Sequence, residues 1–480
     1  MNRDFTLPQL EERVLSTLNP DGSRRWMTPR TSKGRFWRAR AVVAYALIVI
    51  FAVLPWLRIH GKPPLFLDIM TRQFTFFGTT FRPTETLLLS LLMLSIFVAI
   101  FLATAVLGRV WCGWGCPQTV YMEFLYRPIE KLMLGKAYGK KGQHAPAWRV
   151  VLMYLIFVLF SAHLANTFLA YFVGTDRLVE WTFQSPWKHP AAFAVFAVTL
   201  GLMLFDFAFF REQLCTLVCP YGRFQSVLLD RDTIVIGYDR VRGEPRAKGA
   251  ERKTMETGGS RAGDCVDCTM CVQVCPTGID IREGLQLECV NCAQCVDACD
   301  DIMDKVGRPQ GLIRYDTQNR LEGKPGHWFR YRLVIYSVVL VVLVSTLVTL
   351  IINRSPALVG QSRIIGSNFT VTPEGRIATP VRILIENRTE VPRTYTVTGS
   401  GDVSIEQGSV TVTVKPSDAE TVNFTVLSPG DSFTHGVRNA QLRVTDGDTY
   451  DRLTTIALTG PFSPVTAPVN APSKPKEPAP

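Results

Sequence analysis

The chain has 480 residues, of which 47% are hydrophobic and 19% are charged, and its formal net charge is +11. A mean hydropathy of +0.14 is high for a soluble protein. The composition therefore indicates a chain that is partly membrane-embedded and partly soluble. The lysines and arginines lie mostly beside apolar stretches, which is typical of membrane topology signals. They do not gather on one soluble face, so we expect no nucleic-acid partner.

Five apolar runs are long enough to cross a hydrocarbon core of about 30 Å as helices. They are residues 40–57, 86–107, 150–173, 191–210 and 333–352. The first is marginal, because Pro55 and Arg58 end it early. No small-residue cleavage site follows it, so we interpret it as an uncleaved anchor in the lipid bilayer. Basic residues gather in the N-terminal segment and in the 108–149 loop, which predicts that both face the cytoplasm and that the C-terminus lies outside.

The region after residue 353 has a different pattern of apolar and polar residues. Segments such as VRILIENR and VTVTVKP alternate apolar and polar residues, and Gly, Pro, Asn and Asp separate them. This pattern predicts an immunoglobulin-like β-sandwich. It offers no catalytic set, so we expect it to bind a partner or to support an assembly. The proline-rich end, residues 464–480, is predicted to be disordered.

Twelve cysteines are the main chemical signal, and none of them lies in the predicted sandwich. They are Cys112, Cys116, Cys215, Cys219, Cys265, Cys268, Cys271, Cys275, Cys289, Cys292, Cys295 and Cys299. Such tight clustering favours metal ligation over a disulfide framework.

The eight cysteines from Cys265 to Cys299 have the spacing of a bacterial ferredoxin with two 4Fe-4S clusters. In each run two residues separate each of the first three cysteines from the next, and three residues separate the third from the fourth. The fourth cysteine of each run ligates the other cluster. One predicted ligand set is therefore Cys265, Cys268, Cys271 and Cys299, and the other is Cys289, Cys292, Cys295 and Cys275. A zinc site is the alternative, but zinc does not explain the last cysteine of each run.

A second signal is a repeated Cys-x3-Cys-Pro motif that follows the second and fourth spans. The motifs are Cys112–Pro117 and Cys215–Pro220. Proline suits the first position of a helix, so Cys116 and Cys219 are expected at helix N-termini, where the dipole lowers a thiol pKa. A parallel repeat would bring the two pairs together. Four soft sulfur ligands favour Cu(I) or a further Fe–S centre, and buried, inert cysteine is the alternative.

Two polar residues inside predicted spans are further candidates, because ionisable groups within a membrane are costly. Asp206 lies near the cytoplasmic end of the fourth span, where it could be structural or functional. His163 lies in the third span. It is either hydrogen-bonded between helices, the commoner role, or adjacent to a quinone, haem or copper group.

Together these features predict a polytopic α-helical membrane bundle with five spans, a two-cluster ferredoxin-like α+β insert and a C-terminal immunoglobulin-like β-sandwich. The predicted parts are a cytoplasmic N-terminal segment (1–39), a four-span region with both Cys-x3-Cys-Pro motifs at its cytoplasmic face (40–210), a cytoplasmic loop (211–332) with the ferredoxin at about 258–305, a fifth helix (333–352), a periplasmic sandwich (353–463) and a disordered tail (464–480). A stretch rich in Gly, Lys, Arg and Glu at about 239–263 is expected to be a flexible tether.

At this point the chain resembles the cytochrome oxidase accessory proteins called CcoG, FixG or RdxA. The resemblance rests on VWCGWGCPQTVYMEFLYRPIE, LCTLVCPYGRFQ, CVDCTMCVQVCPTGIDIREGLQLECVNCAQCVDACD and the terminal sandwich, which follow the family's order over nearly the whole chain. Pro276 follows the last cysteine of the first run, whereas Asp300 follows the last cysteine of the second run. An aspartate at this second position is normal for this family. The NapH-type quinol dehydrogenase subunits resemble only the membrane part and the ferredoxin.

This resemblance implies a membrane-bound reductase of Cu(II) to Cu(I) that serves the assembly of cbb3-type cytochrome oxidase in the bacterial inner membrane. It implies that the ferredoxin cysteines relay electrons and that Cys112, Cys116, Cys215 and Cys219 handle copper. The implied partners are an unidentified cytoplasmic electron donor and oxidase subunits or assembly factors, including a copper chaperone or transporter; a homodimer is a further arrangement to test. Two alternatives stay open: a quinol dehydrogenase-type subunit, and a non-enzymatic assembly scaffold or redox sensor.

Overall fold

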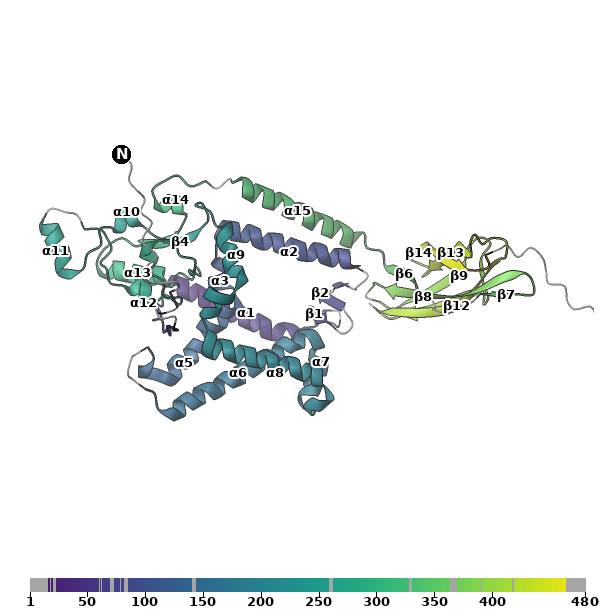
Figure 1. Ribbon diagram of the computed structural model, residues 1–480, viewed down its shortest axis with the longest axis horizontal. Helices are drawn as coiled ribbons and strands as arrows, with labels where there is room; N and C mark the ends of the chain where they lie inside the picture. Colours follow the sequence, from purple (N-terminus) through teal and green to yellow (C-terminus); the bar gives the residue numbers. More distant parts are fainter. Residues whose placement is uncertain are drawn as a thin grey trace, which may run out of the picture. The chain divides into compact units, whose positions relative to one another are not determined.

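The computed structural model describes most of the chain in two compact units that divide after Val348, and each unit is considered by itself (Figure 1). The described residues are 16–17, 19, 23–59, 61, 63–69, 73–77, 79–81, 85–139, 144–258, 262–327, 330–362, 369–389, 391–416 and 418–462. The predicted disordered tail, 464–480, lies outside them.

In the part of the chain that the structure describes, five helices are long and apolar enough to cross a membrane, and they correspond to the five predicted spans. They are α1 (Arg35–Val53, extended by a 3-10 turn to Trp56), α2 (Thr86–Leu107), α6 (Ala147–Val173), α8 (Pro190–Leu204, extended by a π-helical turn to Phe210) and α15 (Tyr331–Ile352). Large apolar side chains are exposed on their outer faces, among them Leu94, Val198 and Val341. Such surfaces suit hydrocarbon rather than water.

Short elements connect the spans. Between α1 and α2 lies a three-stranded antiparallel sheet of β1 (Leu65–Asp68), β2 (Gln73–Phe76) and β3 (Thr79–Phe81). The sequence pattern did not predict it, because three or four residues are too few for an alternation to be recognised. After α6 comes the short helix α7 (Thr175–Thr182), and a 3-10 turn (Pro186–Lys188) leads into α8.

A helix follows each Cys-x3-Cys-Pro motif, as the prolines predicted. The first motif begins in α3 (Val110–Trp114), and after it the chain forms α4 (Pro117–Tyr121), a π-helical turn (Met122–Tyr126) and α5 (Arg127–Leu134). The second motif begins in a π-helical turn (Leu214–Val218), and α9 (Pro220–Leu228) follows it. The π-helical turn that follows α4 packs inside the bundle: the ring of Tyr126 stacks on Phe207 of the fourth span at 4.3 Å and packs edge-on against Phe157 of α6.

The cysteine-rich segment forms a compact α+β part of the first unit. Its elements are β4 (Val235–Tyr238), α10 (Arg240–Gly243), α11 (Gly249–Thr257), α12 (Met270–Gln273), a 3-10 turn (Ile281–Glu283), α13 (Gln294–Lys305), β5 (Ile313–Asp316) and α14 (Gln318–Leu321). Strand β4 precedes the cysteines in the sequence, β5 follows them, and the two strands pair antiparallel. Ile236, Val296 and Ile313 share one hydrophobic core with cysteine side chains.

The expected flexible tether at 239–263 is wrong for the residues that the structure describes there. This stretch contains α10 and α11 and is bonded to the ferredoxin. Arg242 forms an ion pair with Asp264 at 2.5 Å and donates to the carbonyl oxygen of Gln310 at 2.9 Å. The charged residues that suggested a solvated linker instead form ion pairs and hydrogen bonds with the ferredoxin.

The second unit is a β-sandwich, as predicted. Its strands are β6 (Ala357–Ser362), β7 (Thr370–Val371), β8 (Arg376–Asn387), β9 (Arg393–Gly399), β10 (Ser404–Ile405), β11 (Ser409–Val414), β12 (Ala419–Pro429), β13 (Val437–Thr445) and β14 (Asp451–Thr459). One sheet has the order β10-β12-β8-β6 with β7 beside β8, and the other has the order β11-β9-β13-β14. Alternate residues such as Ile383, Val397 and Leu442 form the core between the sheets.

Candidate iron–sulfur and thiol sites

The two cysteine runs of the ferredoxin have the same unusual backbone. In the first run Asp267 and Thr269 have positive φ angles of 49° and 58°, and in the second run Asn291 and Ala293 have 54° and 58°. Non-glycine residues rarely adopt this left-handed conformation, which costs energy and occurs mostly at functional sites. Alternation of left- and right-handed residues turns successive backbone N–H groups toward one point and makes a pocket for an anion. Each loop thus has the shape to wrap a negatively charged group.

The structure brings the predicted ligands of each set together. Burial raises the pKa of Cys299 to about 12, and Cys271 and Cys265 of the other run add to this rise. Burial likewise raises the pKa of Cys289 to about 12, opposed by the backbone N–H of Asn291 and reinforced by Cys275. Cys299 therefore lies near the first run and Cys275 near the second, which is the arrangement that the predicted exchange of ligands requires.

A small cavity lies beside the second set. Cys275, Cys289, Cys292 and Cys295 all line it, together with Cys271 of the first set and apolar groups such as Ile236 and Ile281. Four thiols of one set around a common cavity, an apolar wall and a loop with left-handed residues fit a 4Fe-4S cluster. In the described residues, however, no three cysteine, histidine or acidic side chains are already close enough to hold a single metal ion.

The four cysteines of the repeated motifs also meet, and we call them the four-thiol site: Cys112, Cys116, Cys215 and Cys219. Burial raises the pKa of Cys112 to about 12, and the neighbouring Cys116 and Cys219 add to the rise. Burial raises the pKa of Cys215 as well, and the other three thiols contribute to that shift. The internal repeat therefore brings both pairs to one place, as the sequence predicted.

One expectation about these thiols is wrong. Cys116 and Cys219 do precede helices that start with proline, but the pKa of Cys116 is raised rather than lowered. Burial outweighs the backbone N–H groups of Gln118 and Thr119, which favour the thiolate. Desolvation of a charge by an apolar bundle is stronger than the field of one helix terminus.

Polar side chains hold the four-thiol site in place. The Sγ atom of Cys112 lies 3.2 Å from Oε1 of Gln225 on α9, and the hydroxyl of Thr119 donates to the carbonyl oxygen of Cys112 at 2.6 Å. Asp206 accepts a hydrogen bond from Nε2 of Gln118 at 3.1 Å. Its charge is also felt at Cys116. Asp206 is thus a neighbour of the thiols.

The four-thiol site adjoins the second ferredoxin loop. A Cβ atom at Gly113 would lie 2.6 Å from the carbonyl oxygen of Val290 and 2.9 Å from that of Asn291. A hydrogen-bond bridge crosses the same junction. The indole N–H of Trp114 donates to the hydroxyl of Tyr315 at 3.1 Å, and that hydroxyl donates to the carbonyl oxygen of Asn291 at 2.6 Å. The loop between Cys112 and Cys116 therefore lies directly against the loop between Cys289 and Cys292.

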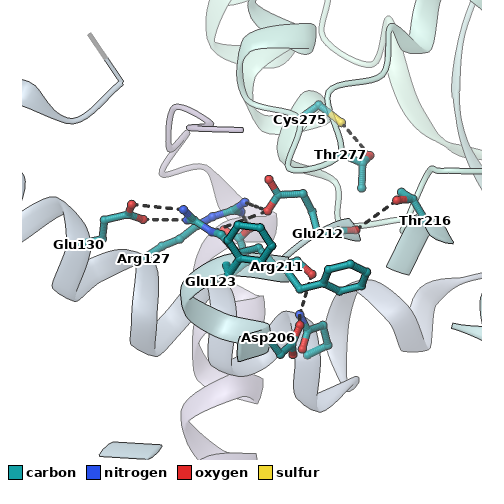
Figure 2. A network of polar contacts seen from close by, with 12 residues as sticks. Glu123, Arg127, Glu130, Asp206, Arg211, Glu212, Thr216, Cys275 and Thr277 are labelled. Carbon is teal, nitrogen blue, oxygen red and sulfur yellow. Dashed lines mark hydrogen bonds and ion pairs between the residues drawn. The ribbon is translucent and has the colours of Figure 1, made fainter. Parts of the chain in front are cut away.

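A buried network of charges links the two halves of the repeat (Figure 2). Arg127, on the helix after Cys116, pairs with Glu123 and lies 3.4 Å from Glu212, which precedes Cys215. Arg211 in turn pairs with Glu130 at 2.8 Å. Both arginine side chains are almost fully buried. Such pairs hold two segments in register, because separating them leaves a charge without water or partner.

The N-terminal segment ties the ferredoxin to the membrane helices. Asp297 of α13 is buried and accepts hydrogen bonds from the backbone N–H groups of Phe36 and Trp37, at 3.0 and 2.7 Å. It therefore caps the first membrane helix from another part of the fold, in the way that an N-cap residue does locally. Sequence reasoning missed Asp297, Tyr315 and Arg40. Arg40 stands at the start of the first apolar run, shortly after Arg35 and Arg38, where basic residues are usual, so its burial had no signal in the sequence.

The side chain of His163 is exposed on α6, which gives no support to the commoner expected role, a hydrogen bond between helices.

Comparison with known proteins agrees with this architecture. Residues 210–318 match the family model described as a 4Fe-4S dicluster domain, and residues 89–141 match a 4Fe-4S binding domain. Residues 347–459 match the model described as an IG-like fold at the C-terminal of FixG, putative oxidoreductase. A membrane-associated iron–sulfur electron-transfer protein is the class that fold and sites define.

The relatives identify the family within that class. Protein RdxA of Cereibacter sphaeroides is 31% identical over 399 residues, which is 78% of this chain and 82% of RdxA. Protein RdxB of the same organism is 32% identical over 81% of this chain and 86% of RdxB. Nitrogen fixation protein FixG of Rhizobium meliloti is 32% identical over 61% of this chain and 57% of FixG. The chain therefore belongs to the FixG/RdxA family, and the FixG relative supports a bacterial membrane location.

Among solved structures, the crystal structure of a FixG-related protein from Vibrio parahaemolyticus is similar to 22% of this chain and 97% of its own length. The sequence identity is 19% and the TM-score is 0.19.

Proposed function

We propose that this chain reduces Cu(II) to Cu(I) at the four-thiol site and that the product serves the assembly of a cbb3-type cytochrome oxidase. One observation carries the proposal: the loop between Cys112 and Cys116 lies against the loop between Cys289 and Cys292, with no room for a side chain at Gly113. A thiol site for a soft metal thus adjoins a site for an electron carrier. Copper as the substrate comes from the resemblance to the oxidase accessory proteins.

The chain's own residues divide the work. The sets Cys265, Cys268, Cys271, Cys299 and Cys275, Cys289, Cys292, Cys295 hold the clusters, which supply one-electron transfer when bound. Of the two sets, the second is the one next to the four-thiol site, because Asn291 belongs to its loop. Trp114 and Tyr315 keep the two loops at a fixed separation, and Asp297 keeps the ferredoxin on α1.

The reaction is a one-electron reduction. Cu(II) is the substrate, it accepts one electron and it leaves as Cu(I), while a cytoplasmic one-electron donor protein is oxidised. Thiolate ligands favour Cu(I) over Cu(II), so the four-thiol site makes the reduction easier. Both sites are cytoplasmic in this proposal, because basic residues flank them. The sandwich is periplasmic and docks an oxidase subunit or a copper chaperone or transporter.

The test compares the wild-type chain with a variant in which Cys112, Cys116, Cys215 and Cys219 are all changed to Ala. Both proteins are purified anaerobically in detergent and analysed for iron, acid-labile sulfide and copper. We expect about eight iron atoms per chain in both proteins, and copper in the wild type alone. When Cu(II) is added to the reduced wild type by stopped flow, the clusters should be reoxidised in parallel with Cu(I) formation. The number of thiols should stay unchanged. Equal copper in the variant contradicts the proposal.

The contact at Gly113 gives a second test. Gly113→Ala forces the two loops apart, and overpacking of this kind costs about 1–3 kcal/mol. We expect the same iron content, the same copper stoichiometry and slower Cu(II) reduction. Gly201→Ala on α8 is the matched control, since a Cβ there has open space around it. An unchanged rate in Gly113→Ala would remove this contact from the electron path.

A second candidate is a further Fe–S centre at the four thiols. The 4Fe-4S binding domain model covers residues 89–141 and so includes Cys112 and Cys116. The same quadruple variant separates the two ideas, because it would then lose about four iron atoms per chain. A quinol dehydrogenase would need a quinone site in the bundle, for which His163 was the candidate. Its side chain is exposed, so it does not support that role, and it has no bearing on a scaffold role.

A further inference from the structure

Arg40 is a buried cation with unused hydrogen-bond donors. It lies on α1 and is 1% exposed, and its Nε donates to the carbonyl oxygen of Gly113 at 2.8 Å. Its Nη1 and Nη2 atoms have no hydrogen-bond partner, and within the described residues no carboxylate forms an ion pair with it. A buried guanidinium without a counter-charge costs several kcal/mol. Apart from the ring of Phe124 at 5.5 Å, the guanidinium therefore lacks the counter-charge that a negative group bound nearby would supply.

The second ferredoxin loop is the negative partner that the geometry offers. Arg40 bonds to Gly113, and Gly113 lies against Asn291, which precedes Cys292. The charge of Arg40 acts on Cys292, and so does the charge of Glu123. A second cation, Arg109, donates to the carbonyl oxygens of Leu287 and Gly222, and its charge is felt at Cys289.

The first ligand set has different surroundings. The cation beside Cys271 is Arg282, and Asp280 and Asp267 both pair with it. Asp300 adds negative charge beside Cys299 and is only weakly countered by Arg35 at 3.6 Å. The second ligand set thus lies beside Arg40 and Arg109, which have no carboxylate partner in the described part of the chain, and the carboxylate of Glu123 that also acts on it is paired with Arg127. The first set lies beside an arginine that two carboxylates neutralise and beside the additional carboxylate of Asp300.

Local charge sets the order in which two similar clusters accept electrons. Reduction adds a negative charge to a group that already carries several thiolates, so a nearby unpaired cation raises the reduction potential and a nearby carboxylate lowers it. We propose that the set Cys275, Cys289, Cys292 and Cys295 holds the higher-potential cluster, and that Arg40 is the positioning residue that raises its potential. This inference rests on the ligand sets of the proposed function, but not on copper.

The consequence is directional. An electron that enters at the first set moves to the second set, which adjoins the four-thiol site. Arg40 touches both sides of that junction, because it bonds to the loop of one site and its charge acts on a ligand of the other. The same residue therefore holds the two sites together and makes the forward transfer favourable.

The test is a potentiometric titration of the anaerobic full-length protein in detergent, followed by EPR. We expect two midpoint potentials in the wild type. In Arg40→Gln only the higher one should fall, enough to change the electron distribution between the clusters at least tenfold, which is about 59 mV for one electron. Arg40→Lys keeps the charge and should restore most of the shift. The matched control is Arg330→Gln, which also removes a partly buried arginine; Arg330 pairs with Asp230 and contacts no cluster cysteine.

The signals are assigned with Cys268→Ser and Cys289→Ser, each of which perturbs one ligand set. The inference is overturned if the higher-potential signal belongs to the set of Cys268. It is also overturned if iron content is normal and Arg40→Gln shifts neither signal, or both equally. If Arg40→Gln does not fold, the wild-type assignment and Arg40→Lys still decide the matter. A wild-type protein without iron would instead defeat the ligand sets of the proposed function.

Discussion

The ferredoxin loops and the four-thiol site are both made of cysteines, but they are built in different ways. In the ferredoxin each loop is formed within seven consecutive residues, and two left-handed residues give it its shape. In the four-thiol site, two pairs that are about a hundred residues apart meet because buried ion pairs hold their helices together. The ferredoxin therefore carries its geometry locally, whereas the four-thiol site depends on long-range charges. Changes to each region should have different consequences.

The largest effect is expected at Arg127, because its loss leaves the mostly buried Glu123 without a cation and leaves the buried Glu212 with Arg211 at 3.9 Å. Arg127→Ala should lower the free energy of unfolding by about 3–5 kcal/mol, as for other broken buried pairs. It should also lose copper from the four-thiol site before it loses iron from the ferredoxin. Thermal unfolding in detergent and metal analysis measure both effects.

Lys305→Ala is the control for this experiment. Its pair with Asp301 has the short distance of 2.6 Å, but both side chains are mostly exposed, so the loss should stay below about 1 kcal/mol. If Arg127→Ala proved as mild as Lys305→Ala, or lost iron and copper together, the contrast between the two regions would be wrong.

Two buried alanines test whether the left-handed ferredoxin loop is strained. Ala293 is buried at φ 58°, whereas Ala298 is buried inside α13. A left-handed alanine costs about 1–2 kcal/mol that glycine does not, while glycine inside a helix costs about 1 kcal/mol. Ala298→Gly should therefore be about 2 kcal/mol less stable than Ala293→Gly. Denaturant unfolding of the iron-loaded proteins measures the difference, and equal losses would mean that the loop is unstrained.

The sequence predicted the parts of the molecule that a local pattern can encode. The five spans and the sandwich follow from apolar runs and alternation, while the two ferredoxin ligand sets stay a prediction from the cysteine spacing. The meeting of the two Cys-x3-Cys pairs followed from their repeat. In contrast, the pairing of β4 with β5 was not predicted. One strand precedes the cysteine segment and the other follows it, and a strand of four residues is too short for its alternation to be recognised.

Contacts between distant segments were beyond sequence reasoning. Asp297 caps a helix that begins about 260 residues earlier, and Tyr315 bridges two cysteine loops. Aspartate and tyrosine are also common on protein surfaces, so the residue type alone does not indicate that Asp297 and Tyr315 make these contacts. The raised pKa of Cys116 was missed for the same reason, because its cause is burial by packed helices rather than its place at a helix terminus.

Proton release on metal binding is the smallest effect, and it tests what burial does to the four-thiol site. Since the pKa of Cys112 is raised to about 12, this thiol is protonated throughout the neutral range and must lose its proton to bind Cu(I). Affinity should therefore fall as pH falls, tenfold per pH unit for each proton displaced, which is about 1.4 kcal/mol. Anaerobic competition with a Cu(I) chelator from pH 6 to pH 8 measures the slope, after correction for the chelator's own protons. Cys112→Ala should reduce the slope by one proton. A flat affinity would mean that the thiols are already ionised, and that the helix termini, not burial, control their charge.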